Sequence, residues 1–213
     1  MSLLVEQPAS LGAPRSPATG IRHHPARKYH QTDIPTIGYL FVPMSREEFL
    51  ELDYEFGKAE WADGVAILMA AARNPHSLLV GNVISAVISS LTGIRVIPEV
   101  TLPLDDSVRE PDLAIVPTPN YSPNWRIGIP LVVIEVLSPS TRKLDMGQKA
   151  DEYLAHGISQ YWVVDPVAES IEVRMNVGSE WRSAVVVDAE NPEAEIAVGE
   201  HGVVWLDHAA IFE

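Results

Sequence analysis

The chain has 213 residues, 46% of them hydrophobic, which suits one globular domain of ordinary size with a real hydrophobic core. The formal net charge is −14. The first 40 residues carry four basic and two acidic side chains, or +2, so residues 41–213 carry −16. A body with this charge would repel nucleic acid, which could bind only at a local site where metal ions supply the positive charge. The sequence contains no cysteine and no apolar run long enough to span a membrane, which excludes disulfides, cysteine zinc sites and membrane spans and is compatible with the cytoplasmic location that we expect.

The first segment, residues 1–40, is rich in Pro, Ala, Ser, Gly and His and shows no apolar period. This composition predicts a disordered or loosely ordered N-terminal arm, followed by a single domain over residues 41–213. The stretch RHHPARKYH within the arm is compatible with a metal-binding or nucleic-acid-binding tail. A solvated linker is the simpler interpretation.

The first elements of the domain have clear local signals. Ser45 followed three residues later by Glu48 is a capping box, which predicts a short helix. Two strands around the Asp63-Gly64 turn are predicted in KAEWADGVAILMA. Apolar residues then recur at helical spacing over residues 74–91, which predicts an amphipathic helix.

Strands dominate the rest of the domain. RVIPEVTLPL and PDLAIVP are predicted as strands joined by the acidic turn DDSVRE. PLVVIEVLS is nearly continuously apolar, which is typical of a strand buried on both faces. The segments SIEVRM, WRSAVVV and VVWL predict a further hairpin or small sheet at the C-terminal end.

A crossover unit lies between these parts. LDMGQKADEYLAHG is predicted as a helix that Asp145 caps and Gly157 ends, and SQYWVVDP as the next strand. Two strands joined through a helix are usually parallel neighbours in one sheet. We therefore expect the strand that contains Glu135 to lie beside SQYWVVDP.

Two carboxylates stand out in the predicted sheet. Asp112 begins the strand DLAIV, and Glu135 lies among Val and Ile in the next strand. Adjacent strands lie about 4.8 Å apart, so the two side chains can converge on one cation. A buried carboxylate is costly unless it is paired or bound to metal, and oxygen ligands suit Mg²⁺ or Mn²⁺. The alternatives are a strand-start or turn acid for Asp112, and a residue on a solvated sheet face or in a buried salt bridge for Glu135.

Lys149 is the basic residue expected near this pair. It borders the apolar stripe of its helix, which must face the sheet, so its side chain can reach back toward Glu135. A cation at that place would stabilise negative charge on a phosphate. The alternative is a surface lysine paired with Asp145 or Asp151.

These segments carry a family resemblance. EPDLAIV and PLVVIEVLSPSTRKLDMGQKADEYLAHGISQYWVVDP, with AEWADGVAILMAAARNPHSLLVGNVISAVISSL upstream, resemble the Uma2 family (DUF820) of bacterial endonucleases, within the PD-(D/E)xK nuclease superfamily. The resemblance implies an α/β restriction-endonuclease-like core, a mixed β-sheet flanked by α-helices, to which the predicted hairpins add at both ends. It also implies Mg²⁺-dependent (or Mn²⁺-dependent) hydrolysis of phosphodiester bonds, with DNA as the expected substrate, and a homodimer.

The resemblance also assigns the catalytic residues. Pro111-Asp112 matches the "PD" and Glu135 the second acid, so both are expected to bind the metal. Leu137 stands where the superfamily pattern has a lysine, which makes Lys149 the expected substitute.

Three further groups are expected to support this site. Glu60 matches an acid in the N-terminal half of the family pattern and is interpreted either as a third metal-site acid, directly or through water, or as an ordinary hairpin residue. The backbone carbonyl of Val136 is a candidate metal ligand. Asp145 is a candidate supporting residue at the start of its helix.

Two other functions fit the same sequence. One is a non-catalytic nucleic-acid-binding or protein-interaction module on this fold, which the net charge, the four lysines and the missing Glu-x-Lys favour. The other is a metal phosphoesterase with a small substrate, for which the acidity of the body is a smaller obstacle.

Overall fold

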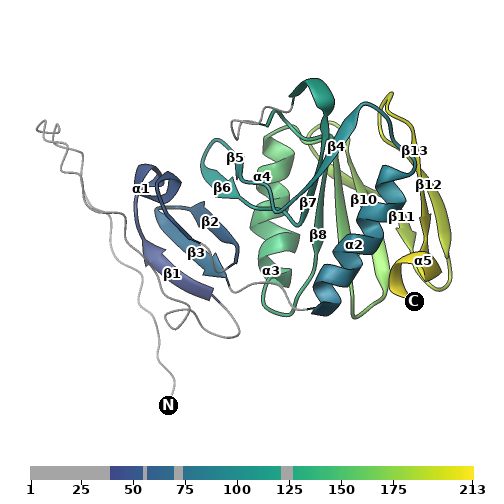
Figure 1. Cartoon of the computed structure of the whole chain (residues 1–213), viewed down its shortest axis with the longest axis horizontal. Helices are drawn as coiled ribbons and strands as arrows, with labels where there is room; N and C mark the ends of the chain where they lie inside the picture. The colour runs from purple at the N-terminus through teal and green to yellow at the C-terminus, as the bar shows by residue number, and fades with distance from the viewer. Residues whose placement is uncertain (1–38, 55–56, 70–73, 121–126) are drawn as a thin grey trace, which may run out of the picture.

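The computed structural model describes residues 39–54, 57–69, 74–120 and 127–213 (Figure 1). The predicted N-terminal arm lies outside the described residues except for its last two. Within the described part of the chain, no helix has the length and apolar content that a membrane crossing requires.

A six-stranded mixed sheet forms the centre of the fold. Its strands are β4 (Ile94–Pro98), β7 (Leu113–Pro117), β8 (Val132–Val136), β9 (Gln160–Asp165), β10 (Ser170–Asn176) and β11 (Trp181–Val187), in the spatial order β11-β10-β9-β8-β7-β4. The pair β8 and β9 is parallel and the other neighbours are antiparallel. The predicted crossover unit and the mixed sheet are therefore confirmed.

Helices cover both faces of this sheet (Figure 1). Val83 and Val87 of α2 (Asn74–Ile88) pack on one face with Ile134, whereas Tyr153 of α4 (Ala150–Ala155) packs on the other with Val133. Side chains alternate between the faces along a strand. Glu135 therefore shares the face of Val133 and points toward α4.

A second, five-stranded sheet lies beside the first. It contains β1 (Tyr39–Pro43), β2 (Ala59–Ala62), β3 (Val65–Met69), β5 (Leu102–Pro103) and β6 (Ser107–Arg109), in the order β1-β3-β2-β6-β5. The predicted hairpin is the antiparallel pair of β2 and β3, whose turn residues Asp63 and Gly64 have φ values of 53° and 78°. The predicted capping box is also present: Ser45 and Glu48 bind each other's backbone N–H at the start of α1 (Arg46–Leu50).

The connection between the two sheets differs from the sequence-based expectation. The predicted strand RVIPEVTLPL is split, because β4 ends at Pro98 and Glu99 has a φ of 48°, a turn conformation. The chain then crosses to the second sheet as β5 and β6, so the supposed acidic turn contains a strand, and it returns at Asp112. This excursion brings the second sheet against the start of β7.

The helix before β9 also differs from the expectation. It begins at α3 (Arg142–Leu144) with Thr141 at the N-cap position, so Asp145 is not the N-cap. A π-helical turn, Asp145–Lys149, follows and leads into α4. A π turn adds one residue and so rotates the following helix by about 100° relative to a regular α-helix. The turn buries both Asp145 and Lys149.

The C-terminal part completes the face covered by α2. The strands β12 (Glu193–Ala197) and β13 (Val203–Asp207) form a separate antiparallel hairpin, followed by α5 (His208–Phe212). The predicted hairpin of β10 and β11 instead extends the main sheet. A short 3-10 helix, Thr118–Asn120, follows β7.

Candidate active site

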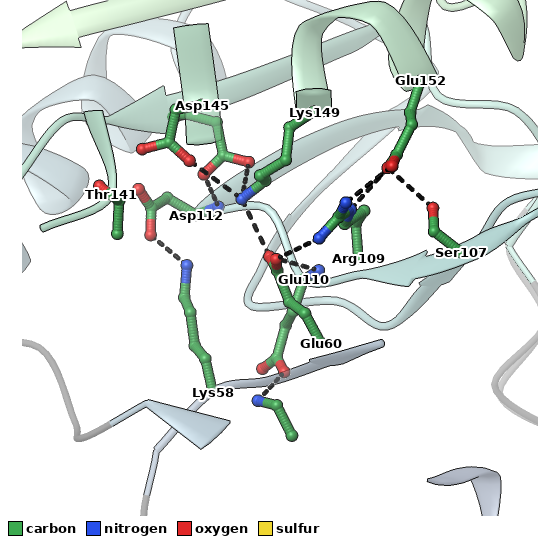
Figure 2. A network of polar contacts seen from close by, with 12 residues as sticks. Lys58, Glu60, Ser107, Arg109, Glu110, Asp112, Thr141, Asp145, Lys149 and Glu152 are labelled. Carbon is green, nitrogen blue, oxygen red and sulfur yellow. Dashed lines mark hydrogen bonds and ion pairs between the residues drawn. The ribbon is translucent and has the colours of Figure 1, made fainter. Parts of the chain in front are cut away.

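The predicted site residues meet where side chains of the second sheet reach the main sheet; Figure 2 shows Glu60, Asp112 and Lys149 of this group. Asp112 precedes β7, Glu135 lies in β8, Lys149 ends the π-helical turn and Glu60 lies in β2. Each of these four residues is between 0% and 4% exposed. Four ionisable side chains that are buried together form either a salt-bridge network or a functional site. Their individual contacts help to distinguish these two possibilities.

Asp112 and Glu135 lie on neighbouring strands, as expected. The Asp112 N–H lies 3.4 Å from Glu135 Oε2, and the Val136 N–H donates to Asp112 Oδ2 at 2.7 Å. The antiparallel register of Leu113 with Ile134 produces this approach. The two carboxylates therefore converge at one end of β7 and β8.

Lys149 is surrounded by carboxylates. Its Nζ lies 2.7 Å from Glu135 Oε1, 2.9 Å from Glu60 Oε1 and 3.2 Å from Asp145 Oδ1. The expected contact with Glu135 and the alternative pairing with Asp145 are thus both present. The lysine is nevertheless buried, which the surface alternative did not anticipate.

Glu60 contacts cations on two sides. Besides Lys149, it accepts hydrogen bonds from Arg109 Nη1 at 3.1 Å and from the Glu110 N–H at 3.2 Å. Arg109 is fully buried and also binds Glu152 through Nε at 2.6 Å and Nη2 at 2.7 Å. In this arrangement Glu60 links the second sheet to the π-helical turn through Lys149, and Arg109 links it to α4 through Glu152.

Three further residues join the site. Lys58 forms an ion pair with Asp112 Oδ1, His76 Nε2 lies 3.2 Å from Asp112 Oδ2, and the Tyr153 hydroxyl donates to Glu135 Oε1 at 2.8 Å. Tyr153 follows Lys149 by four residues, a spacing that places both on one helix face and was visible in the sequence. Lys58 and His76 come from segments far from Asp112, and no spacing in the sequence points to them.

The environment separates the charge states of the two acids. Burial raises the pKa of Glu135 to about 7, and Asp145 and Asp112 add to this while Lys149 opposes it. Burial acts on Asp112 in the same sense, but Lys58 and His76 outweigh it and hold the pKa of Asp112 below its usual range. Asp112 is therefore ionised at neutral pH, whereas Glu135 can gain or lose a proton near neutral pH.

Lys149 keeps its proton. Burial disfavours its charge, but Glu135 and Glu60 outweigh burial and raise the pKa of Lys149 well above the ordinary value. The residue is therefore a fixed cation and a hydrogen-bond donor in this site and does not act as a base.

Several polar atoms at this site lack hydrogen-bond partners. Among the buried side-chain atoms of the described residues, these are the Tyr39 hydroxyl, His76 Nδ1 and Asp145 Oδ1, the last of which is ion-paired with Lys149. His76 contacts Asp112, and the charges of Asp145 and Lys149 act on Tyr39. Ser140 also acts on the Tyr39 hydroxyl and the Val136 backbone acts on His76, so these atoms do not by themselves indicate a ligand site.

The donor set fits a hard divalent cation. Within the described ranges, no three His, Asp or Glu side chains are placed to hold a metal together. Asp112 and Glu135 nevertheless supply two converging carboxylates, and Mg²⁺ usually takes one or two carboxylates and keeps several waters. The pair therefore suits a metal that retains water, and the backbone of Val136 lies beside it.

The chain resembles known proteins in both sequence and fold. Residues 46–204 match the family model Uma2, described as "Putative restriction endonuclease". The crystal structure of a protein from Anabaena variabilis, described as a "putative nuclease belonging to DUF820", shares 22% sequence identity and a TM-score of 0.64, over 80% of this chain and 98% of that one. No curated protein matches the chain. The structural likeness confirms the predicted fold class, and the match over most of the sequence shows that the chain belongs to the Uma2 family.

Proposed function

We propose that this protein is a metal-dependent endonuclease that hydrolyses phosphodiester bonds, with DNA as the substrate. The observation that carries the proposal is the buried pair of Asp112 and Glu135 with Lys149 Nζ 2.7 Å from Glu135 Oε1. The family description and the name of the Anabaena protein support the same class of reaction.

Asp112, Glu135 and the Val136 carbonyl would hold the metal, Mg²⁺ or Mn²⁺. When bound, such an ion activates water and stabilises the charge that develops on the phosphate. Asp112 suits this role because it remains ionised. Glu135 suits it because Tyr153 and Lys149 both bind its Oε1 and so fix the orientation of the carboxylate.

Lys149 replaces the lysine that is missing at Leu137. An ammonium group has three N–H donors, and Glu135, Glu60 and Asp145 provide three acceptors. Lys149 therefore orients Glu135 and places a positive charge next to it. Its ammonium group could contact a phosphate oxygen only if it broke its contact with one of the three carboxylates. Glu60 and Asp145 position Lys149 and do not touch the reacting atoms.

The test is a cleavage assay with the full chain. Supercoiled, linear and single-stranded DNA and RNA are incubated with Mg²⁺, with Mn²⁺ or with chelator. Wild-type protein is compared with Glu135→Ala, with Lys149→Ala and with Glu195→Ala, an exposed acid in β12 that serves as the matched control. We expect metal-dependent cleavage by the wild type and by Glu195→Ala, and loss of cleavage in Glu135→Ala and Lys149→Ala. No cleavage by the wild type, or equal cleavage by Glu135→Ala, would contradict the proposal.

A metal phosphoesterase with a small substrate is the second candidate. The charge of −16 on residues 41–213 favours it, because a small phosphate ester is repelled less than a polyanion. Salt separates the two functions: binding of nucleic acid weakens steeply as salt rises, in proportion to the phosphates contacted. If both the binding of substrate and its hydrolysis depended only weakly on salt concentration, the result would favour the small substrate.

The assembly and location remain part of the proposal. The homodimer is proposed by analogy with the superfamily that the sequence resembles, and the cytoplasmic location is proposed because a sequence without cysteine allows it. Sedimentation of the purified chain measures the first, and cell fractionation measures the second.

A further inference from the structure

The ammonium group of Lys58 contacts Asp112, one of the two acids proposed to hold the metal. It forms an ion pair with Asp112 Oδ1, and the charge of Glu135 acts on it as well. Figure 2 shows the Lys58 side chain directed at Asp112. The side chain is only 14% exposed, so this cation is largely enclosed with the two acids.

The oxygens of the two acids show which positions remain for a metal. Asp112 Oδ2 is already bound by the Val136 N–H at 2.7 Å and contacted by His76 at 3.2 Å. Glu135 Oε1 is bound by Lys149 and Tyr153. Asp112 Oδ1 and Glu135 Oε2 remain, and the latter has only a long contact, 3.4 Å from the Asp112 N–H. The Lys58 ammonium group is paired with the first of these two oxygens, Asp112 Oδ1.

Lys58 reaches the site from the second sheet. It directly precedes β2, and its backbone carbonyl accepts a hydrogen bond from the Met69 N–H at 2.9 Å. Its backbone is thus anchored to the β2 and β3 hairpin, whereas Asp112 and Glu135 belong to the main sheet. The long, flexible stem of a lysine lets the ammonium group leave the acids without any change in either sheet.

We infer that the Lys58 ammonium group occupies the metal position of the metal-free protein and must leave Asp112 when a divalent cation binds. An ammonium group and a divalent cation cannot share Asp112 Oδ1, and in a buried site their repulsion is only weakly screened. Lys58 therefore lowers the metal affinity of the site and acts as a built-in competitor. The inference rests on the metal site of the proposed function.

Metal binding to the full chain tests the competition directly. Mn²⁺ is titrated by calorimetry into wild-type protein, Lys58→Met and Lys58→Arg. Lys143→Met, which removes the same charge from an exposed position, is the matched control. We expect Lys58→Met to bind Mn²⁺ on the order of tenfold more tightly than the wild type, because an opposing charge at contact distance is removed. Lys58→Arg and Lys143→Met should bind like the wild type.

The outcomes separate this inference from the proposed function. If the wild type binds Mn²⁺ and Lys58→Met binds it equally or more weakly, Lys58 does not compete and the inference fails, while the metal site stands. An equal gain in Lys143→Met would show a general charge effect and would also overturn the inference. If no variant binds Mn²⁺, both the inference and the proposed metal site fail.

A second measurement needs no substitution at the site. Reductive methylation of the wild type is followed by mass spectrometry with and without saturating Mn²⁺. Because metal binding would release Lys58 from Asp112, its labelling should increase, whereas the buried Lys149 stays protected and the exposed Lys143 reports equal reagent exposure. Unchanged labelling of Lys58 in Mn²⁺-bound protein would overturn the inference even if Lys58→Met does not fold.

Discussion

Lys149 Nζ lies 2.7 Å from Glu135 Oε1, and this contact joins the π-helical turn to the central strand β8. The same nitrogen also reaches Glu60 Oε1 at 2.9 Å in the second sheet. One buried lysine therefore connects the π-helical turn to β8 and to β2, the last of which is distant in the sequence. Its removal affects both the stability of the fold and the chemistry of the site.

Replacing Lys149 with methionine should destabilise the protein strongly. The change leaves Glu135 and Glu60 without their shared cation in a buried place, and breaking a buried ion pair from one side costs about 3 kcal/mol or more. Urea unfolding measures the loss in the free energy of unfolding. Lys143→Met, at an exposed position, should change that free energy by less than about 0.5 kcal/mol. Equal losses in the two variants would show that the buried contacts of Lys149 contribute nothing.

Arg109 and Glu152 should be energetically coupled. Arg109 holds Glu152 through two hydrogen bonds of 2.6 and 2.7 Å, which tie β6 to α4. In a double-mutant cycle of Arg109→Met and Glu152→Gln, we expect a coupling free energy of about 1–3 kcal/mol. Thermal and urea unfolding of the four proteins give this value. Strictly additive effects would contradict a direct link between the two elements.

Asp165 should make the stability of the protein sensitive to acid. Burial opposes the shift, but hydrogen bonds from Arg142 and from the N–H groups of Ala168 and Val167 hold the pKa of Asp165 below its ordinary value. A lowered pKa in the folded state stabilises the protein above the unfolded pKa, and this contribution is lost as the pH falls through the folded pKa.

Asp165→Asn isolates this contribution. The variant should be less stable than the wild type by a constant amount above about pH 5, and the difference should shrink below about pH 4, since the carboxyl of an unfolded Asp titrates near there. Urea unfolding of both proteins at several pH values measures the difference. If the stability difference between the two proteins grew as the pH fell, the pKa of Asp165 would not be lowered in the folded state, and the explanation would be rejected.

Removing the Tyr153 hydroxyl should slow cleavage and weaken the fold slightly. Tyr153→Phe deletes the 2.8 Å hydrogen bond to Glu135 Oε1, which costs about 1 kcal/mol and frees the carboxylate to rotate. Tyr54→Phe is the control, because its hydroxyl binds the Met69 carbonyl at 2.6 Å, away from the two acids. We expect both variants to lose stability but only Tyr153→Phe to lose cleavage rate in single-turnover assays.

Gly147 should tolerate alanine. It lies within the π-helical turn, and a Cβ at this position would meet no heavy atom within 4 Å. Alanine favours helical structure over glycine by about 0.5–1 kcal/mol, so Gly147→Ala should raise the melting temperature and leave cleavage unchanged. Gly202→Ala is the contrasting variant, because its Cβ would lie 2.7 Å from the Ser90 carbonyl oxygen and should lower the melting temperature.

Features encoded by neighbouring residues could be predicted from the sequence. The capping box of Ser45 and Glu48 and the turn at Asp63-Gly64 depend on residues a few positions apart, and the structure contains both. The parallel pairing of β8 with β9 and the neighbouring positions of Asp112 and Glu135 also follow from the order of elements and the alternation of side chains along a strand. These features supply the two acids and the sheet that holds them.

Features that depend on the packing of distant segments could not be predicted. Glu60 meets Lys149 across 89 positions and Lys58 meets Asp112 across 54, and no local pattern encodes either contact. The π-helical turn, which makes Asp145 a buried partner of Lys149 and not an N-cap, likewise forms against the sheet. The sequence by itself thus determined the acids and their strands through local propensity and periodicity. The contact of Lys149 with Glu135 was also expected from the sequence, but only the tertiary structure decided that Lys58 faces Asp112 and that Glu60 shares Lys149, because both contacts depend on how the second sheet packs on the first.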